Sequence, residues 1–409
     1  MNSDLDIFTL GLGLKAPWQV ISSAFDPNAG GLLLLVNCSR GVPMPCPHCQ
    51  RACPRYDSVS REWRHLNFWQ YETRLSASVP RVSCPEHGVV MAEVPWARPG
   101  SGFTLLFEAF VVRLAKDMPL AAVARLVVEH DSRLWRIVRH YVARLRAGIS
   151  HAAVRRVGID ETSANAKVPF ITVAVDMDER RVLFATPGKD GATIGAFAED
   201  LINHGGDPLA ITDVSADMSA AFTAGVRLHL PNAQMTYDKF HAVKLVTDAL
   251  DEVRRDEYAS GGSLTGILSG SRYSMLKNAE NQTDYQAMLA KVITLPVLNL
   301  KTGKAYRLKL AFQEAYQQSG ELGITALKVW CKWAQRCRLP DFQRVAKTIR
   351  SHWDGIVRYF TSGLTNAILE GINSLIQSAK ARARGFRNID NLIAMVYLIA
   401  GRLPLPAIK

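Results

Sequence analysis

Two short cysteine and histidine motifs constrain the fold of the first hundred residues more than any other feature of the sequence. Cys46-Pro-His-Cys49 and Cys84-Pro-Glu-His87 each carry two metal-ligand side chains on one tight turn, and residues 50–83 separate them. Three thiolates and an imidazole form a closed tetrahedral set for zinc, which stabilises a fold and leaves no open position for catalysis. We therefore predict one structural Zn²⁺ ion, bound by Cys46, Cys49, Cys84 and His87.

The remaining cysteines keep alternatives open. The chain has seven cysteines, and four of them lie between Cys38 and Cys53. This usage favours metal binding in a reducing compartment over a disulfide framework. The segment between the two motifs exceeds the roughly 15–20 residues usual in such sites, so Cys38, His48 and Cys53 are alternative ligands, and buried free thiols are the alternative to any zinc. Cys331 and Cys337 lie on helical sequence and are expected to be core or surface thiols.

Residues 1–102 are predicted to form this zinc-binding N-terminal module, and the module is predicted to be rich in strands. Apolar and polar side chains alternate from Trp69 to Leu75, as in a strand with one buried face. The longest purely apolar run, Leu32–Val36, is far shorter than the ~18 residues of a membrane helix. Met1–Asp6 has two Asp and no basic residue, unlike a secretory or transit signal, so we expect the protein to remain where it is made.

A helix-turn-helix DNA-binding domain is predicted over residues 103–150. Pro119 begins one helix, and Asp131 or Ser132 caps a second. The apolar positions of each helix share one face: Leu120, Val123, Ala124 and Val127, then Leu134, Ile137, Val138 and Tyr141. Arg133, Arg136 and Arg139 recur every three residues on the second helix, the element that enters the major groove. We expect them to contact DNA, which the formal net charge of +12 also favours.

The sequence from residue 151 onward predicts a mixed α/β core. Strands are expected at 154–159, 168–175, 180–185, 208–212 and 233–237, with helices at 194–203 and 219–228. Three strands joined by short turns, followed by alternating strands and helices, indicate a sheet with antiparallel and parallel parts. The small residues of 259–270 suggest a linker, the sequence is then helical to residue 360, and a last long helix is expected at 366–383.

Carboxylates occur where the predicted strands end. Asp160 closes the first strand, Asp213 and Asp217 bracket the exit of the fourth, and Glu370 lies on the last helix with Asn373 on the same face. Three such acids, brought together, would bind two Mg²⁺ or Mn²⁺ ions, which prefer oxygen ligands and act on phosphoryl groups.

These motifs together resemble those of bacterial insertion-sequence DDE transposases of the ISL3 type. The resemblance covers nearly the whole chain. Its most specific blocks are Tyr237-Asp-Lys-Phe-His-Ala-Val-Lys244 and the stretch from Leu369-Glu-Gly-Ile-Asn373 to Arg384-Gly-Phe-Arg-Asn388. It implies a ribonuclease-H-like core in two parts, 151–258 and 363–409, interrupted by an α-helical insertion over 259–362.

The resemblance also implies the catalytic residues and the activity. Asp160, Asp217 and Glu370 would be the triad that binds two Mg²⁺ or Mn²⁺ ions, with Asp213 as the competitor of Asp217. The protein would bind the terminal inverted repeats of its element as double-stranded DNA, cut them, and join them to target DNA. It would do so as a homodimer or higher assembly on DNA, in the bacterial cytoplasm at the nucleoid. The alternative is a non-catalytic regulator that uses only the zinc module and helix-turn-helix.

Further residues are expected to support this site. Asp238 and His241, three apart, resemble an Asp-x-x-His signature of related transposases, and with Asn373 they form a predicted supporting set. The competing interpretation of Asp238 is a helix cap beside a buried histidine. A basic cluster follows the last helix and is predicted to bind DNA phosphates. Its members are Lys380, Arg382, Arg384 and Arg387.

Overall fold

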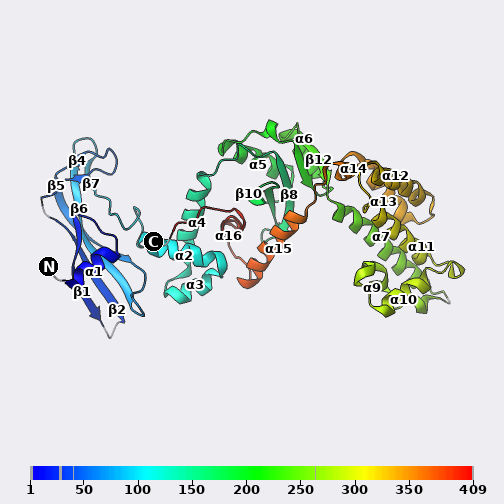
Figure 1. The fold of residues 1–409 in the computed structure, drawn as a ribbon, viewed down its shortest axis with the longest axis horizontal. Coiled ribbons are helices and arrows are strands. Elements are labelled where there is room, and N and C mark those ends of the chain that lie inside the picture. Colours follow the sequence, from blue (N-terminus) through cyan, green and yellow to red (C-terminus); the bar gives the residue numbers. More distant parts are fainter. Residues whose placement is uncertain (1–2, 27–29, 40, 263, 408–409) are drawn as a thin grey trace. The chain divides into compact units, whose positions relative to one another are not determined.

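The computed structural model describes residues 3–26, 30–39, 41–262 and 264–407 of the chain. The chain forms two compact units (Figure 1). Unit 1 contains residues 1–145 and 403–409, and unit 2 contains residues 146–402. Each unit has its own hydrophobic core. No helix in the described ranges combines the length and apolar character that crossing a membrane requires.

Unit 1 begins with a helix and a five-stranded sheet of order β1-β2-β6-β5, with β7 paired to β6. β2 and β6 are parallel, and the other neighbours are antiparallel. The inward side chains of these strands form the core, so the predicted β-rich module is confirmed. The elements are α1 (Ser3–Gly11), β1 (Trp18–Asp26), β2 (Gly31–Cys38), β3 (Met44–Pro45), β4 (Ala52–Cys53), β5 (Arg55–Arg64), β6 (Glu72–Cys84) and β7 (Gly88–Met91).

The strand predicted from Trp69 begins later, at Glu72. Phe68 and Tyr71 exchange two backbone hydrogen bonds of 3.0 Å, which close a tight turn. Trp69 sits in that turn with a left-handed φ of 54°. The alternating side chains of residues 69–71 therefore belong to this turn, and those from Glu72 onward belong to the strand. The prediction of a strand was wrong for residues 69–71.

Three helices complete unit 1, and they confirm the predicted helix-turn-helix. They are α2 (Leu105–Asp117), α3 (Leu120–Val127) and α4 (Asp131–Ala147). All eight apolar positions predicted to face inward on α3 and α4 are buried. Val128 ends α3 in the left-handed conformation, and its N–H bonds the carbonyl of Ala124. This tight ending sets the turn between the two helices.

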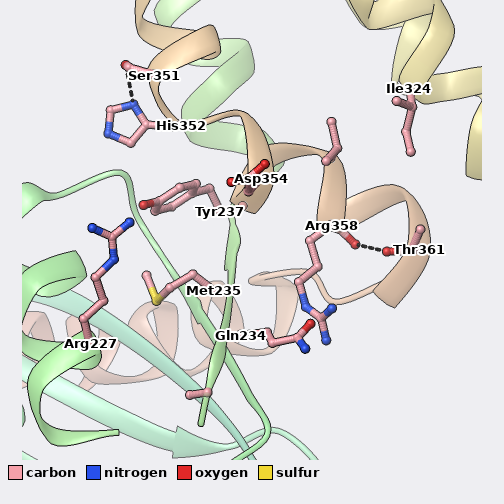
Figure 2. Close-up of a pocket in the computed structure, with 13 residues that line it drawn as sticks. Arg227, Gln234, Met235, Tyr237, Ile324, Ser351, His352, Asp354, Arg358 and Thr361 are labelled. Carbon is pink, nitrogen blue, oxygen red and sulfur yellow. Dashed lines mark hydrogen bonds between the residues drawn. The ribbon is translucent and has the colours of Figure 1, made fainter. Parts of the chain in front are cut away.

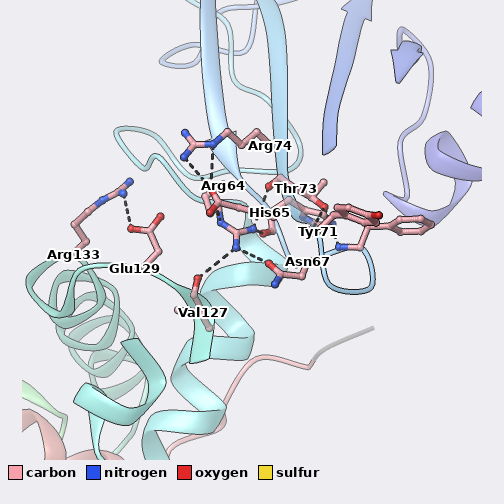
Figure 3. A network of polar contacts seen from close by, with 11 residues as sticks. Arg64, His65, Asn67, Tyr71, Thr73, Arg74, Val127, Glu129 and Arg133 are labelled. Atoms are coloured by element: carbon pink, nitrogen blue, oxygen red, sulfur yellow. Dashed lines mark hydrogen bonds and ion pairs between the residues drawn. The ribbon is translucent and has the colours of Figure 1, made fainter. Parts of the chain in front are cut away.

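One buried arginine joins the sheet of unit 1 to its helices (Figure 3). Arg64, at the end of β5, is 3% exposed. Its guanidinium donates to Asn67 over 2.5 Å, to the carbonyl of Thr73 over 3.3 Å, and to the carbonyl of Val127 over 3.4 Å. It also lies 5.4 Å from the centre of the Phe107 ring. These contacts link β5, β6, α2 and the end of α3.

Unit 2 is built on a second five-stranded sheet, of order β10-β9-β8-β11-β12. β10, β9 and β8 are antiparallel, whereas β8, β11 and β12 are parallel, as the sequence predicted. The strands are β8 (Arg156–Ser163), β9 (Phe170–Asp176), β10 (Arg181–Pro187), β11 (Asp213–Ala216) and β12 (Gln234–Tyr237).

Helices cover both faces of this sheet. Val157 and Ile159 of β8 pack with Ile194 and Phe222 on the face covered by α5 (Gly191–Asn203) and α6 (Ala220–His229). The alternate residues of β8 point to the other face. There they meet α15 (Ala367–Arg382), beside which α16 (Ile389–Ala400) packs on β10. The sheet is therefore the middle layer of three.

The prediction of a strand at 208–212 was wrong. Pro208–Ala210 is a short 3₁₀ turn, and the strand β11 starts only at Asp213. The Asp207 side chain accepts from the N–H of Leu209 over 2.9 Å, and this cap favours the turn over a strand. Asp213 consequently begins the strand instead of following it.

The sequence between β12 and α15 is helical throughout, as predicted, and its core includes Phe312, Trp330 and Phe342. The linker expected at 259–270 is shorter, because α7 extends to Ala259 and a short helix occupies 265–268. The helices are α7 (Lys239–Ala259), α8 (Thr265–Leu268), α9 (Arg272–Leu276), α10 (Asp284–Ile293), α11 (Lys301–Ala315), α12 (Gly320–Arg336), α13 (Pro340–Ser351) and α14 (Trp353–Ser362), with 3₁₀ turns at Ala279–Asn281 and Pro296–Leu298.

The Arg64 network makes the stability of unit 1 dependent on pH through His65. The His65 ring lies 2.8 Å from the Thr104 hydroxyl, and burial, reinforced by Arg64, lowers the pKa of His65 to about 4. In the unfolded chain the ring takes up a proton near pH 6.5. The unfolded state therefore binds more protons between these values, and stability is lost as pH falls from 6.5 to 4, by up to about 3 kcal/mol.

We predict that thermal unfolding of the full chain at pH 7.5 and pH 5 will show this loss. His65→Gln should keep the hydrogen bond to Thr104 and reduce the loss of stability of unit 1 between pH 7.5 and pH 5 by about 2 kcal/mol. Protonation of the zinc ligands should account for pH dependence that remains in the variant. Equal pH dependence in the wild type and the variant would contradict the role of His65.

Candidate active site, zinc centre and basic residues

Three aspartates lie at the same level of three neighbouring parallel strands. β8 pairs with β11, and β11 pairs with β12. In this register Asp160 of β8 is level with Asp217, which directly follows β11, and with Asp238, which directly follows β12. The Asp238 N–H donates to the carbonyl of Ala216, the last residue of β11, over 3.1 Å. Asp217 and Asp238 thus lie at the carboxyl ends of their strands, where ligands bind in α/β sheets. Asp160 does not close its strand as predicted, because β8 continues for three residues beyond it, to Ser163.

Asp213 lies at the opposite end of β11. Its register partner on β8 is Arg156, four residues before Asp160. Its carboxylate accepts from Arg358 over 2.5 Å and from the Thr212 hydroxyl over 2.8 Å. Burial alone raises its pKa, but these two partners hold the pKa of Asp213 below its usual value. Asp213 therefore has its own cationic partner, Arg358. Because Asp213 lies at the level of Arg156 and Asp217 lies at the level of Asp160, the register favours Asp217 as the acid beside Asp160.

Helix α15 brings Glu370 to the same region because it lies along β8. Three of its side chains donate to this strand in order: Asn373 to the Asp160 carboxylate over 2.7 Å, Gln377 to the Thr162 hydroxyl over 2.7 Å, and Lys380 to the Ser163 carbonyl over 3.0 Å. Glu370 lies one turn before Asn373 and is exposed. Asn373 thus contacts Asp160, and Glu370, one turn earlier on α15, interacts electrostatically with Asp238 and His241.

A glycine allows this close packing of helix on strand. A Cβ at Gly158 would lie 2.6 Å from the Met177 sulfur and 2.8 Å from Cδ1 of Leu369. Leu369 is fully buried, directly before Glu370. Before the helix, the amide oxygen of Asn366 accepts from the Ser215 hydroxyl of β11 over 2.5 Å. Both contacts fix the start of α15 against the sheet.

Sequence reasoning missed Gln377, Asn366 and Gly158. Gln377 follows Asn373 by four residues, which places both amide side chains on one helical face. This spacing was the available signal for Gln377. A glycine inside a predicted strand was a second signal, because such a glycine often marks a close approach of another element.

The surroundings of the site shift the pKa values of Asp160, Glu370 and His241. Burial raises the pKa of Asp160 to about 6, and Asp217 and Asp238 act in the same direction, against the Glu161 N–H and His241. Glu370 is exposed, but partial desolvation of its carboxylate still raises its pKa, with Asp238 contributing. Asp238, followed by Asp217 and Asp160, raises the pKa of His241. These shifts indicate negative charge that the neighbouring side chains only partly balance.

Asp238 has a buried carboxylate oxygen that lacks a partner. The residue is 2% exposed, and its Oδ1 has no hydrogen-bond partner in the described part of the chain. The other oxygen lies 3.4 Å from Nδ1 of His241. A buried carboxylate oxygen without a partner is costly, and a divalent ion with oxygen ligands would remove that cost.

The carboxylates do not form one compact ligand set in this structure. Within the described residues, the His, Cys, Asp and Glu groups whose ligand atoms all lie within 4.8 Å of one another do not include Asp160, Asp217 or Glu370.

The predicted zinc ligands come together in unit 1. Ligand atoms of Cys46, Cys49, Cys84 and His87 all lie within 4.8 Å of one another. The sulfur atoms of Cys49 and Cys84 are 3.7 Å apart. Nδ1 of His87 lies 3.8 Å from the Cys46 sulfur and 3.5 Å from the Cys84 sulfur. A tetrahedron with Zn–S of about 2.3 Å has ligands separated by about 3.8 Å. The set therefore fits a structural zinc ion.

The alternative ligands lie outside this set. Cys53 is buried and its thiol contacts the Arg51 carbonyl at 3.3 Å, whereas the Cys38 thiol contacts the Ser39 carbonyl at 3.7 Å. The His48 ring packs against His87 at 5.0 Å between centres. All seven cysteines lie in the described ranges and none is in a disulfide. Cys331 and Cys337 are buried, so they are core thiols.

The arginines of α4 divide into two kinds. Arg133 pairs with Glu129 over 2.6 Å (Figure 3) and lies 4.4 Å from the centre of the Phe103 ring. Arg136 and Arg139 are exposed. Arg133 thus has internal partners that a DNA phosphate or base would have to replace, whereas Arg136 and Arg139 present their side chains to solvent.

The basic residues after Glu370 also differ among themselves. Lys380 donates to the Ser163 carbonyl of β8, whereas Arg384 and Arg387 are exposed. Arg382 ends α15. The N–H of Gly385 bonds the Lys380 carbonyl over 2.8 Å, and Arg384 holds the left-handed position with φ 56°. Glycine usually occupies that position at a helix end, so an arginine there is unfavourable for the backbone.

A cavity of about 520 Å³ lies between β12 and α14 (Figure 2). Arg227 of α6, Tyr237 of β12, and His352, Asp354 and Arg358 around α14 line it. Its charged groups are of both signs, and Arg358 is already paired with Asp213. Tyr237, which lines the cavity, directly precedes Asp238 in the sequence.

Models of known protein families match the Cys and His region, the helix-turn-helix and the α/β part of the chain. A family model of ISL3 DDE transposases, described as "Transposase", matches residues 157–396. The helix-turn-helix domain of transposase family ISL3 matches residues 92–142, and the zinc-finger of transposase IS204/IS1001/IS1096/IS1165 matches residues 43–87.

Two similar proteins extend over most of the chain. The transposase for insertion sequence element IS1557 of Mycobacterium tuberculosis is 34% identical over 392 residues, which are 88% of this chain and 86% of that protein. The transposase for insertion sequence element IS1001 of Bordetella parapertussis is 26% identical over 358 residues, with 84% and 86% covered.

The packing at Gly158 generates a prediction. Gly158→Ala should displace Leu369 and the start of α15, destabilise unit 2 by about 1–3 kcal/mol because the site is overpacked, and weaken the contact between Asn373 and Asp160. Gly371→Ala is the matched control, since a Cβ there meets nothing within 4 Å. It lies on α15 and should stabilise the helix by about 0.5–1 kcal/mol. Melting temperatures of both variants test this, and equal effects would contradict it.

Proposed function

This chain belongs to the ISL3 family of transposases, and from that premise we propose that it cuts the ends of an insertion sequence and joins them to target DNA. The helix-turn-helix domain gives it a DNA-binding module. In the proposed activity this module recognises the terminal inverted repeats. The observation that carries the catalytic proposal is the row of Asp160, Asp217 and Asp238 beside α15, which bears Glu370.

We assign Asp160, Asp217 and Glu370 as the residues that hold two Mg²⁺ or Mn²⁺ ions. Such ions activate the attacking oxygen and stabilise the leaving oxygen at a phosphate. Asn373 would orient the Asp160 carboxylate through its 2.7 Å hydrogen bond. Asp238 and His241 would support the site, Asp238 by adding negative charge at the strand ends and His241 by balancing part of it.

The reaction would proceed in two displacements at phosphorus. In the first, a water oxygen attacks the phosphate at the element's end, the bond to the 3′ oxygen breaks, and that oxygen leaves as a hydroxyl. In the second, this 3′ oxygen attacks a target phosphate and releases a 3′ hydroxyl of the target strand. Each step exchanges one P–O bond for another, so no covalent bond between protein and DNA is needed.

The sheet order supports a ribonuclease-H-like core. Three antiparallel strands are followed by two parallel strands, with helices on both faces. Asp160 lies within β8, level with Asp217 and Asp238, which directly follow β11 and β12. The helices from α8 to α14, within residues 259–362, would then be the insertion, since the chain leaves the core after β12 and α7 and returns to the sheet with α15. We propose that the chain acts as a homodimer or higher assembly, because two element ends must be held for joining.

Charge-removing variants test the triad. Asp160→Asn, Asp217→Asn and Glu370→Gln should each lower the rate of end cleavage in Mn²⁺ by about a thousandfold or more, as expected when several kcal/mol of transition-state stabilisation are removed. Binding to the element's end should stay within a few-fold. Asp213→Asn is the matched control and should keep activity, because its partner is Arg358. An inactive Asp213→Asn with an active Asp217→Asn would reverse the assignment.

Arg384→Gly separates DNA binding from helix capping. Glycine relieves the left-handed backbone, so the melting temperature of unit 2 should rise by about 1–4 °C. If Arg384 binds phosphate, affinity should fall equally on specific and random duplexes, and the slope of log affinity against log salt concentration should become shallower by ~0.9 for each phosphate that the variant no longer neutralises.

The matched control for this variant is Arg180→Gly. Arg180 is exposed, has a φ of 52°, and lies in the turn between β9 and β10, away from the level of Asp160. It should give the same stabilisation with an unchanged salt slope. An unchanged slope in Arg384→Gly as well would show that Arg384 only ends the helix.

A further inference from the structure

Unit 2 contains another set of metal-ligand side chains, which is separate from the carboxylates of the proposed active site. His151 precedes β8, and Asp200 and His204 lie at the end of α5. One ligand atom from each of these three residues lies within 4.8 Å of the other two. Asp200 and His204 are four residues apart, a spacing that puts two ligands on one face of a helix, while His151 comes from a separate segment.

His151 is the observation that calls for a ligand. It is 2% exposed, and neither of its ring nitrogens has a hydrogen-bond partner among the described residues. Its ring centre lies 4.7 Å from that of His204. Buried polar groups are nearly always satisfied, so two orphaned nitrogens on one ring require an explanation. A metal ion among these three residues would satisfy one of them.

The surroundings of the other two ligands also suit a metal. Nδ1 of His204 lies 2.8 Å from the Asp200 carbonyl, so Nδ1–H donates there and Nε2 keeps its lone pair. Metal-bound histidines commonly donate their other N–H to a carbonyl in this way. The Asp200 carboxylate accepts from Arg146, and ligating carboxylates are usually supported by such a donor.

We propose that His151, Asp200 and His204 bind a zinc ion, in addition to the one held by the cysteine motifs of unit 1. Imidazole nitrogen and carboxylate oxygen are both common ligands of Zn²⁺. The backbone N–H of His151 donates to the His204 carbonyl over 2.8 Å, so the two segments are already aligned. The ion would fasten the chain just before β8, the strand that carries Asp160, to the end of α5.

The charge of this site predicts weaker binding than at the cysteine set. It has one carboxylate, which Arg146 already neutralises in part, whereas the cysteine set offers three thiolates. A chelator should therefore remove zinc from the histidine set first.

Metal counting on the full-length protein tests the proposal. Protein purified without chelator and dialysed against limited zinc should contain about two zinc ions per chain. His151→Phe keeps a ring against His204 and removes both nitrogens; it should contain about one. Cys49→Ser should also contain about one, retained at the histidine set. About one zinc in the wild type, or an unchanged count in His151→Phe, would overturn the proposal.

Cobalt gives a second measurement that does not depend on any single variant. Co²⁺ bound to thiolates shows intense sulfur-to-metal charge transfer in the near ultraviolet, whereas Co²⁺ bound to nitrogen and oxygen does not. The wild type should bind a second Co²⁺ equivalent that adds only weak visible bands, and His204→Gln should lose this second equivalent. If all bound Co²⁺ shows charge transfer, only the cysteine set binds metal and the proposal fails.

Discussion

The docking of α15 along β8 is the contact on which the carboxylate site depends. Asn373 and Asp160 are 213 residues apart in sequence and are joined by a hydrogen bond of 2.7 Å. Between them the chain leaves the sheet after β12, forms the helices from α7 to α14, and returns. Gly158 permits the return because it leaves room for Leu369. Without this packing, Glu370 would have no defined place beside the acids on the strands.

The parallel register explains why the acids lie together and why they need a counter-charge. Asp160, Asp217 and Asp238 share one level, so burial and mutual repulsion raise the pKa of Asp160 to about 6. Repulsion of this kind is unfavourable for the folded state. His241 offsets part of it, and bound divalent ions would offset the rest. Asp213, at the other end of β11, is paired with Arg358 and has no such need.

Local patterns in the sequence predicted much of this arrangement. The convergence of the two Cys and His motifs, the inward faces of α3 and α4, and the mixture of antiparallel and parallel strands followed from spacing and periodicity. Most other contacts between distant segments did not. The partner of Asn373, the contact of Arg133 with the Phe103 ring, and the cluster at His151 depend on how separate elements pack. The strand predicted at 208–212 failed because a capped turn at Asp207 outweighed an apolar stretch.

The most direct test of the account is the position of the metal ions in a complex with element-end DNA. Anomalous diffraction from Mn²⁺ identifies them independently of activity. We predict two Mn²⁺ ions about 3.5–4 Å apart, within about 2.0–2.3 Å of carboxylate oxygens of Asp160, Asp217 and Glu370. Ions bound at Asp213 instead, or Mn²⁺ absent from the row formed by Asp160, Asp217 and Asp238, would contradict it.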